Sequence, residues 1–379
     1  MLKLAEIANA VKPRERTDKY LILAALYCLN AHTGPVTTRQ VTALLEGQFG
    51  KKAVPDNVTA SLTKYSAYVD PADIGPPRKW QLTQQGLAHL RALSGLSLAA
   101  PSNPGDFQSD VGIVCALEDP EWNAVAKAFG GAAAWAEILE ARYPHVYREC
   151  KFSVNVGGPL HMVAVTTTSM GLTAAAIATT QMVMRFQPRL VVMIGIAAGT
   201  EGGNKQFGDV LVADPSVDYN SGKIVMIKGT RKFQPDPYPI GLAPRLRALL
   251  KKYQGANHDV FQRIQSGWKE RLPGTPNRLH LGALGAADQV VDDATRLVEI
   301  EDHWRKLIGV EMESYAVYRA CWEARQPRPD FVAFKAVCDF AANKSDSWQE
   351  YAAYTAAEFA AEFLRSEWHT LWTDPQGAG

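Results

Sequence analysis

The sequence predicts an α/β protein with two globular domains, and three observations lead to this prediction. The chain has 379 residues, more than a single domain of average size contains. Of these residues 47% are apolar and 21% are charged, which is typical of a globular protein with a sizeable core. From residue 110 onward, short β-branched runs alternate with helix-length segments, a pattern typical of a buried sheet that helices cover on both faces.

The boundary between the domains falls near residue 100, where Ser, Gly and Pro are concentrated. We expect a first domain over residues 1–98, a linker over 99–109 and a second domain over 110–379. Residues 1–100 contain 12 Lys and Arg against 7 Asp and Glu, whereas the rest of the chain contains 28 against 32. The opposite net charges indicate that the two domains meet different partners.

The first domain is predicted to contain three helices, a two-stranded ribbon and a closing helix. Apolar spacing and capping residues place the helices at 18–31, from 37 or 38, and at 58–65, the extended segments at 68–69 and 78–82, and the last helix at 83–93. This order resembles the winged-helix family. Residues 80–86 in particular are similar to a second wing strand that runs into a capped helix.

In a winged helix, the third helix enters the major groove of DNA and the wing contacts phosphates. Five cations lie on or beside these elements, namely Lys51, Lys52, Lys64, Arg78 and Lys79. They are enough for non-specific phosphate contacts. Solvated faces of a domain that contacts protein or mediates oligomerisation explain the same charges equally well, so a nucleic acid and a sensor partner both stay open.

The second domain is predicted to alternate strands and helices. The strands are expected at 111–115, 162–166, 190–194, 209–213, 308–310 and 331–337, and the helices at 121–129, 172–186, 243–253, 294–304, 314–324 and 348–364. Ligands in such folds collect beyond strand ends. The loops at 116–122, 195–200, 310–314 and 337–340 are therefore candidate site loops, and together they offer several acids but no paired histidine base.

Two of these loops carry the motifs Val310-Glu311-Met312-Glu313 and Ala336-Val337-Cys338-Asp339. In this order they resemble the nucleoside phosphorylase and nucleosidase superfamily, which includes the methylthioadenosine/S-adenosylhomocysteine nucleosidases. The likeness covers about residues 110–364 and implies a three-layer α/β/α domain with a central mixed twisted sheet. Residues 335–341 and 348–353 are most similar to a branch fused to sensor or immunity modules and linked to adenine-nucleotide degradation in defence.

The resemblance implies roles in breaking a purine N-glycosidic bond, which builds positive charge on the ribose and negative charge on the base. Asp339 matches the acid that protonates or hydrogen-bonds N7, so it must retain or share a proton near neutral pH, which apolar neighbours favour. Glu313 matches the carboxylate that binds the ribose hydroxyls. Three further matches are Met312 under the ribose, and Val290 and Val291, whose backbone groups read the purine edge.

The acceptor of the ribose is either water or phosphate. Met193 stands where phosphorylases have a phosphate-binding arginine, and Ile196 stands where the family commonly has serine, so a phosphate nucleophile has lost two partners. Glu121 matches the nucleosidase glutamate that deprotonates the attacking water, provided that one residue near Pro120 counts as an insertion. We therefore favour hydrolysis over phosphorolysis.

Two more residues belong to these loops, and a basic stretch follows the loop at 195–200. We expect Glu311 to support its loop and Phe340 to be a core aromatic that also borders the base. The basic residues Lys205, Lys223, Lys228, Arg231 and Lys232 are sufficient to neutralise a 5′-phosphate chain such as that of ATP. A solvated loop explains these charges equally well.

Other features of the sequence exclude several classes of protein. The five cysteines are scattered without a CxxC spacing, and the histidines lack metal-ligand spacing, so we expect a reducing, cytoplasmic setting and neither metal nor cofactor. The apolar stretch at 20–31 is too short to span a bilayer, and we expect no membrane segment or export signal. The family resemblance implies a homo-oligomer.

The expected function is that of a purine N-glycosidase acting on an adenine nucleoside or nucleotide, ATP included, in a regulated defence-type effector. One alternative is a phosphate-dependent purine nucleoside phosphorylase. Another is a DNA-binding regulator that senses a purine ligand. The presence of both Asp339 and Glu313 argues against the regulator, because a pure sensor does not need an acid at N7.

Overall fold

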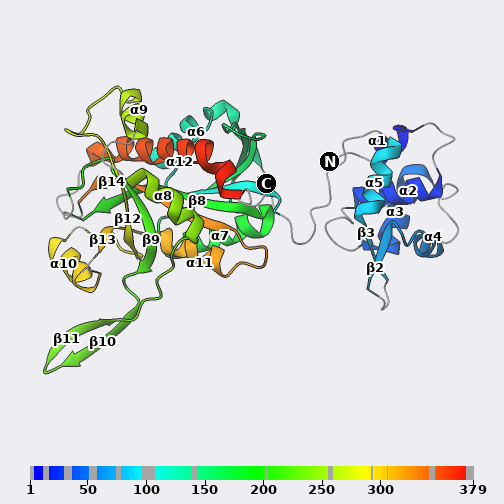
Figure 1. The fold of residues 1–379 in the computed structure, drawn as a ribbon. Coiled ribbons are helices and arrows are strands. Elements are labelled where there is room, and N and C mark those ends of the chain that lie inside the picture. Colours follow the sequence, from blue (N-terminus) through cyan, green and yellow to red (C-terminus); the bar gives the residue numbers. More distant parts are fainter. Residues whose placement is uncertain are drawn as a thin grey trace, which may run out of the picture. The chain divides into compact units, whose positions relative to one another are not determined.

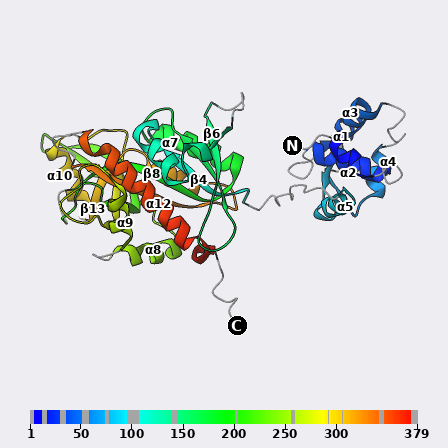
Figure 2. The same cartoon turned by 90° about the horizontal axis from the view of Figure 1, so that it is seen from above.

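The computed structural model describes residues 4–11, 17–29, 36–50, 58–73, 78–94, 107–138, 144–200, 204–254, 259–291, 293–304, 306–340 and 346–372. The chain consists of two compact units, which comprise residues 1–106 and residues 107–379 (Figures 1 and 2). Lys51 and Lys52 lie outside the described residues, as do residues 99–106 of the expected linker.

The first unit is built from helices and a small sheet. The helices are α1 (Leu4–Asn9), α2 (Asp18–Cys28), α3 (Thr38–Phe49), α4 (Val58–Lys64) and α5 (Gln84–Ser94). The strands β1 (Val36–Thr37), β2 (Val69–Asp73) and β3 (Lys79–Leu82) form an antiparallel sheet in the order β1-β3-β2. Helix α1 and strand β1 were not predicted from the sequence.

Side-chain caps and one apolar helix organise this unit. Thr37 and Gln40 form a capping box at the start of α3, and the Thr17 side chain caps α2 by accepting a hydrogen bond from the Tyr20 N–H. Helix α2 is apolar on every side and lies in the core, which also includes Trp80 of β3. Lys64 and Arg78 are exposed, and Lys79 is half-buried.

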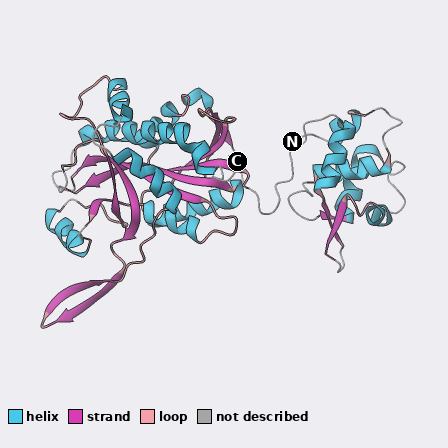
Figure 3. Cartoon of the chain, in the orientation of Figure 1, coloured by secondary structure: helices cyan, strands magenta, loops and turns pink. Residues whose placement is uncertain are grey.

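A nine-stranded mixed sheet forms the centre of the second unit (Figure 3). Its order is β13-β12-β9-β14-β8-β4-β7-β6-β5, with β14, β8, β4 and β7 mutually parallel and β9 antiparallel to β14. The strands are β4 (Ser109–Cys115), β5 (Ala136–Ile138), β6 (Tyr147–Phe152), β7 (Leu160–Thr166), β8 (Pro188–Gly199), β9 (Val210–Asp218), β12 (Leu279–Ala286), β13 (Leu307–Glu311) and β14 (Asp330–Asp339).

Helices cover both faces of this sheet, which gives the three layers that the sequence predicts (Figures 1 and 2). One face carries the long α12 (Gln349–Trp372), which contacts α6 (Asn123–Ala128), α8 (Pro244–Lys251) and α9 (Asp259–Gly267). The other face carries the packed pair α7 (Leu172–Phe186) and α11 (Ser314–Trp322). Helix α10 (Ala294–His303) precedes β13, which pairs with β12 and also with the end of β8.

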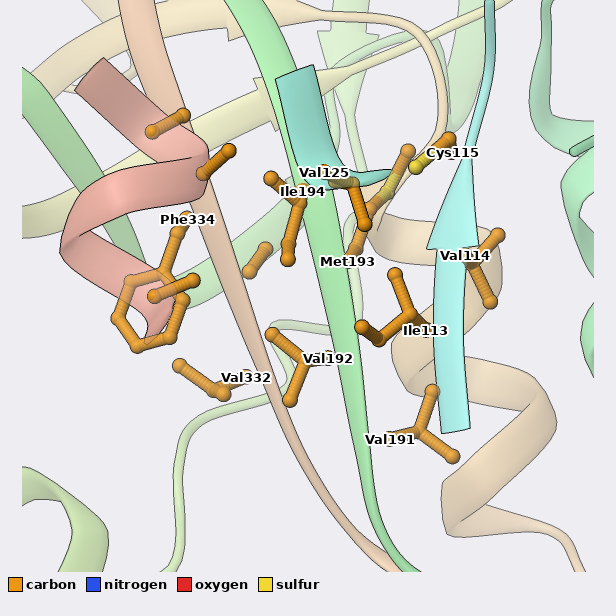
Figure 4. Packing of buried hydrophobic residues seen from close by; sticks show 14 of the residues in the cluster. Ile113, Val114, Cys115, Val125, Val191, Val192, Met193, Ile194, Val332 and Phe334 are labelled. Carbon is orange, nitrogen blue, oxygen red and sulfur yellow. The ribbon is translucent and has the colours of Figure 1, made fainter. Parts of the chain in front are cut away.

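The central strands are buried on both sides because their side chains are almost all apolar. Val191, Val192, Met193 and Ile194 of β8 alternate between the two helical layers (Figure 4). Burying one such side chain stabilises the fold by roughly 1.5–3 kcal/mol. The strands β4, β8 and β14 therefore form a rigid base for the loops at their carboxyl ends.

Several elements differ from the sequence-based expectation. Strands β5, β6 and β12 and helix α9 were not predicted, because β6 carries charged residues between its apolar ones and β12 contains two glycines. The helix expected at 121–129 is preceded by a π-helical turn over Glu118–Trp122 and only then continues as α6. Within the described part of the chain, no helix is both long and apolar enough to cross a membrane.

A two-stranded ribbon, β10 (Gly222–Ile227) and β11 (Thr230–Pro235), follows β9 and was likewise not predicted. Its strands pair only with each other and form a sheet of their own. Figure 1 shows the ribbon extending outward from the rest of its unit.

Candidate active site

A cavity of about 300 Å³ lies where the ends of β4, β8, β13 and β14 meet. All but one of the residues predicted for the substrate site line it: Glu121, Ile196, Val290, Val291, Glu311, Met312, Glu313 and Asp339. The exception is Phe340, whose ring instead contacts the ring of Phe207 with 5.3 Å between centroids. Residues from loops far apart in the sequence thus meet in one pocket of a size suited to a small ligand.

Glu121 reaches the cavity through the π-helical turn. The Trp122 N–H donates to the Leu117 carbonyl five residues earlier, at 3.0 Å, so this turn holds one residue more than an α-helical turn. The sequence required one inserted residue near Pro120 to align Glu121 with the glutamate of the resemblance. The π-helical turn contains one residue more than an α-helical turn at the position where the alignment needs the insertion.

Three backbone N–H groups hold the Glu121 carboxylate. Oε2 accepts from Ala116 at 2.7 Å and from Leu117 at 3.0 Å, and Oε1 accepts from Ile196 at 2.9 Å. Gly195 of β8 leaves room for this carboxylate, because a Cβ there would stand 2.1 Å from Oε1. Burial raises the pKa of Glu121, although the Lys335 ammonium and the backbone N–H groups oppose the rise.

The two glutamates that follow β13 have different partners. Glu311 accepts hydrogen bonds from the N–H groups of Glu313 and Ser314, both at 3.0 Å, and from the Ser314 hydroxyl at 2.7 Å, so it fixes the turn into α11. Glu313 accepts from the Gly171 N–H at 3.0 Å. Gly171 has a φ of 112° and caps α7, which ties that helix to the Glu313 carboxylate.

Lys335 is the site residue that the sequence reasoning missed. It lies on β14 with 1% of its side chain exposed, and its Nζ is 3.2 Å from Glu313, 3.3 Å from Glu311 and 3.9 Å from Glu121. Burial lowers the pKa of Lys335, but Glu313, Glu121 and Glu311 together raise it well above its ordinary value. A signal was available, because a lysine inside a run predicted to be a buried strand requires carboxylate partners.

Burial and the same ammonium act on Glu311. Burial raises the pKa of Glu311, and the charge of Lys335 lowers it. Three carboxylates around a single ammonium leave an excess of negative charge inside the protein when all of them are ionised. The cluster therefore favours whatever reduces that excess, either a bound proton or positive charge on a ligand.

Asp339 is the last residue of β14 and lines the same cavity as the glutamates. It is half-buried, and the neighbouring Cys338 Sγ lies 3.4 Å from its Oδ2. Behind it, the rings of Phe207 and Trp348 stack with centroids 4.8 Å apart, and Phe207 also meets Phe340. Phe340 is partly buried and packs against the hydrophobic core together with this aromatic group.

The basic residues that the sequence offers for the 5′-phosphates of a nucleotide do not line the cavity. Among the described residues that line the cavity there is no Lys or Arg. Lys223, Lys228, Arg231 and Lys232 are on the projecting ribbon β10–β11. Lys205 instead donates to the carbonyl and hydroxyl oxygens of Thr200.

Met193, which stands in place of a phosphate-binding arginine, is completely buried in the core of β8. Across the described residues, no group of His, Cys, Asp and Glu is arranged to hold a metal ion.

A larger groove of about 690 Å³ between α7 and α11 is lined mostly by apolar side chains, and its Arg319 and Glu323 pair with each other at 2.6 Å. The smaller, acidic cavity is therefore the candidate active site.

Comparison with known proteins gives one family match and several relatives. The model of the phosphorylase superfamily matches residues 110–366. The uncharacterized protein y4jS of Sinorhizobium fredii is 30% identical over 67% of this chain and 60% of that protein. The 5′-methylthioadenosine/S-adenosylhomocysteine nucleosidase of a Marinomonas species is 26% identical over 48% of this chain and 70% of that protein. The ATP nucleosidase Cap17 of Escherichia coli is 24% identical over 56% of this chain and 43% of that protein.

The chain thus spans less than two thirds of the length of y4jS and of Cap17. Among solved structures, a 5′-methylthioadenosine/S-adenosylhomocysteine nucleosidase of Helicobacter pylori covers 68% of this chain and 99% of its own, with a TM-score of 0.52 and 20% identity. This likeness confirms the α/β class and the layered arrangement that the sequence predicts.

Proposed function

The chain belongs to the phosphorylase superfamily, and from this membership we propose that it is a purine N-glycosidase that hydrolyses the bond between adenine and ribose. Relatives named as a 5′-methylthioadenosine/S-adenosylhomocysteine nucleosidase and as an ATP nucleosidase support the reaction class. The proposed substrate is an adenine nucleoside or nucleotide.

One observation carries this proposal. Asp339, Glu313 and Glu121, three carboxyl groups in different surroundings, line the same cavity. We assign Asp339 to N7 of the base, where it protonates or hydrogen-bonds the departing purine. Glu313 binds the ribose hydroxyls and faces the positive charge that develops on the sugar.

Glu121 is assigned as the general base that deprotonates the attacking water. Its carboxylate is held by three backbone N–H groups, so it keeps one orientation. Burial raises the pKa of Glu121, which makes its carboxylate a stronger base than that of an exposed glutamate, and the Lys335 charge favours the ionised form. Glu311 supports the turn, and Met312 with the backbone of Val290 and Val291 bounds the sugar and the base.

Lys335 keeps the carboxylates in place without meeting the substrate. It is not among the residues that line the cavity, yet it contacts all three glutamates. The excess negative charge of the cluster complements an oxocarbenium-like ribose, which is positively charged only in the transition state.

The residues at the positions where phosphorylases bind inorganic phosphate support hydrolysis rather than phosphorolysis. Met193 is buried and Ile196 offers only its backbone N–H, which Glu121 already occupies. Without a cation on the described cavity wall, an inorganic phosphate nucleophile has no partner of opposite charge.

The proposal extends to ATP as substrate and to a regulated, defence-type effector. The likeness to an ATP nucleosidase supports the first part. Removing adenine from ATP depletes the energy supply of the cell that makes the enzyme, so such an activity needs control. The first unit, residues 1–106, is the candidate sensor.

Adenine release measured by liquid chromatography tests the proposal. ATP, AMP, adenosine and methylthioadenosine are incubated with the full chain, with and without inorganic phosphate. We expect free adenine at a rate that does not depend on phosphate, together with the ribose or ribose phosphate and no ribose 1-phosphate. Release that requires phosphate would make the enzyme a phosphorylase, and no release from any of the four substrates would refute the proposed activity.

A further inference from the structure

The segment that follows β12 forms one wall of the cavity. Residues 287–291 make up this segment, which we call the base wall, and Gln289, Val290 and Val291 line the cavity from it. Its two ends are fixed by packing, because Ala287 and Val291 are buried in a small apolar cluster. Its middle is exposed, with 57% of Val290 open to solvent. Apolar packing therefore does not fix the middle of the wall.

Two hydrogen bonds hold the middle of the base wall. The Tyr219 hydroxyl donates to the Gln289 carbonyl at a long 3.4 Å. Asp288 Oδ1 accepts from the Leu172 N–H at 2.5 Å, which joins the wall to the first turn of α7, 116 residues earlier in the chain. Asp288 is exposed, so its hydrogen bond rather than its burial relates the wall to this helix.

The preceding N–H of the same helix end holds the carboxylate assigned to the ribose. The Gly171 N–H donates to Glu313 Oε1 at 3.0 Å, and the next N–H, that of Leu172, donates to Asp288. The first N–H groups of a helix have no partner inside it and attract negative charge. Because consecutive Cα atoms are about 3.8 Å apart, the base wall and the ribose carboxylate are tied to neighbouring points of one rigid element.

We propose that Asp288 is a positioning residue: it fixes the base wall to the helix end that also holds Glu313, and so sets the position of the purine relative to the ribose. This inference rests on the proposed function, since it concerns the two halves of a nucleoside in that cavity. Asp288 itself does not line the cavity. Cleavage needs Asp339 at N7 while Glu313 binds the sugar, and a base displaced relative to the sugar misaligns this pair.

Gly171 leaves the space that this arrangement needs. Its φ of 112° favours glycine, and a Cβ at this position would overlap Asp288 Oδ1. An alanine would displace Asp288 from the Leu172 N–H and strain the N–H that binds Glu313. The residue that lies between the two carboxylates can therefore carry no side chain.

Removing the carboxylate of Asp288 gives the first test. Product inhibition by free adenine is measured with the full chain and the substrate that the wild type cleaves fastest. We expect Asp288→Ala to raise the Ki of adenine by about tenfold, because the wall loses its tie to α7. Asp288→Asn keeps an oxygen that accepts the same hydrogen bond, and we expect its Ki to stay within about twofold of the wild type. A merely structural role would reduce the amount of folded enzyme and leave Ki unchanged.

Asp293→Ala is the matched control. Asp293 is also exposed, lies outside the cavity lining, and accepts the Thr295 N–H at 2.8 Å as the cap of α10. The control thus removes an equivalent hydrogen bond at a nearby helix start, and we expect a wild-type Ki. The inference is overturned by a wild-type Ki in Asp288→Ala, by equal rises in Asp288→Ala and Asp293→Ala, or by a rise in Asp288→Asn as large as in Asp288→Ala.

Gly171→Ala gives the second test, with Gly157→Ala as its control. Gly157 has a similar φ of 107°, but a Cβ there meets no atom within 4 Å. We expect Gly171→Ala to raise the Ki of adenine by at least about tenfold and to lower kcat, because both ties to α7 are disturbed. Gly157→Ala carries the same backbone strain and should keep wild-type values. Equal effects of the two substitutions, or a wild-type Ki in Gly171→Ala, would contradict the inference.

Failure of this inference differs from failure of the proposed function. In the latter case, the wild type releases adenine from none of the substrates. A wild type that releases adenine, combined with an unchanged Ki in Asp288→Ala, removes only the role of Asp288. A wild type that releases adenine but is not inhibited by it also overturns the inference, because the wall then does not bind the base.

Discussion

At the scale of single residues, the candidate site depends on how buried charges are balanced. Lys335 compensates Glu121, Glu311 and Glu313, and none of the four exposes more than a few per cent of its surface. Removing one partner from a buried ion pair leaves an uncompensated charge, which typically costs more stability than the pair contributes. For substitutions at these residues, both enzymatic activity and the free energy of unfolding must therefore be measured.

Asp339→Asn tests the acid at N7. The amide has nearly the same size but does not supply an acidic proton, and general acid catalysis contributes about 10²–10⁴-fold to rate. We expect adenine release to fall by at least about 10²-fold, while the midpoint of thermal unfolding stays unchanged. Turnover at the wild-type rate would contradict the assignment.

The pH profile of kcat/KM tests Glu121 as the base. Only the ionised carboxylate accepts a proton, and burial raises the pKa of Glu121 above its ordinary value of 4.5. We expect kcat/KM to fall toward acid pH through a limb whose midpoint lies above 4.5. A profile that stays flat down to that pH would show that another group activates the water.

The same raised pKa affects stability with a definite sign. Between the ordinary and the raised value, the folded protein binds a proton at Glu121 that the unfolded chain does not hold. The free energy of unfolding therefore decreases as pH rises through this interval.

Lys335→Met separates a positioning role from a purely structural one. Loss of the ammonium leaves three buried carboxylates without compensation, and we expect a destabilisation of about 3–5 kcal/mol in denaturant unfolding. Since Lys335 lowers the pKa of Glu121, the acid limb of kcat/KM should also move to higher pH. A loss of stability with an unmoved limb would limit Lys335 to a structural role.

At the scale of elements, the ends of two strands and one unusual turn shape the site. Strand β8 passes so close to Glu121 that Gly195 has no room for a side chain, and the π-helical turn brings Glu121 to that point. Strand β14 carries Lys335 into the core and Asp339 to the cavity. Because these elements are held by the packed sheet, small displacements at their ends change the chemistry.

Gly195→Ala tests this close approach. A Cβ would overlap Glu121 Oε1, so the carboxylate must move and lose hydrogen bonds to Ala116, Leu117 or Ile196. We expect kcat to fall by at least about tenfold with the unit still folded by circular dichroism. Gly274→Ala is the control, since a Cβ there meets no atom within 4 Å, and we expect it to keep full activity.

At the scale of the whole molecule, a small unit of helices and a three-stranded sheet precedes the larger unit that contains the candidate active site. Nucleic-acid binding by the first unit stays a prediction. Lys64 and Arg78 are exposed and Lys79 is half-buried.

Changing Lys64, Arg78 and Lys79 to Ala tests this prediction in the full chain. Each lost phosphate contact reduces the slope of log K against log salt by about 0.9. We expect weaker binding of duplex DNA by fluorescence anisotropy and a shallower slope. The control K127A/K151A/K269A, which removes three exposed lysines of the second unit, should be unchanged. A wild type without affinity for DNA at low salt would leave the first unit as a protein-binding sensor.

Much of the fold was predictable because it depends on local patterns. The helix at 172–186 has the predicted ends. The strands predicted at 111–115, 162–166 and 331–337 are longer in the structure by only a few residues. Strands β6, β10, β11 and β12 were missed because their pattern does not separate them from loops. Pairing with another strand determines them: β10 pairs with β11, β6 with β7, and β12 with β9, which lies about 70 residues earlier.

The sequence by itself determined the order of buried strands and helices, the family, and the acids Asp339, Glu313 and Glu121 as candidates, since these follow from local pattern and motif spacing. Only the tertiary structure decided that Lys335 sits among three glutamates, that a π-helical turn delivers Glu121, and that the basic residues near 230 stand on a ribbon outside the cavity. The physical reason is that charge balance, close approach and strand pairing depend on distances between segments far apart in the chain, which sequence order does not contain.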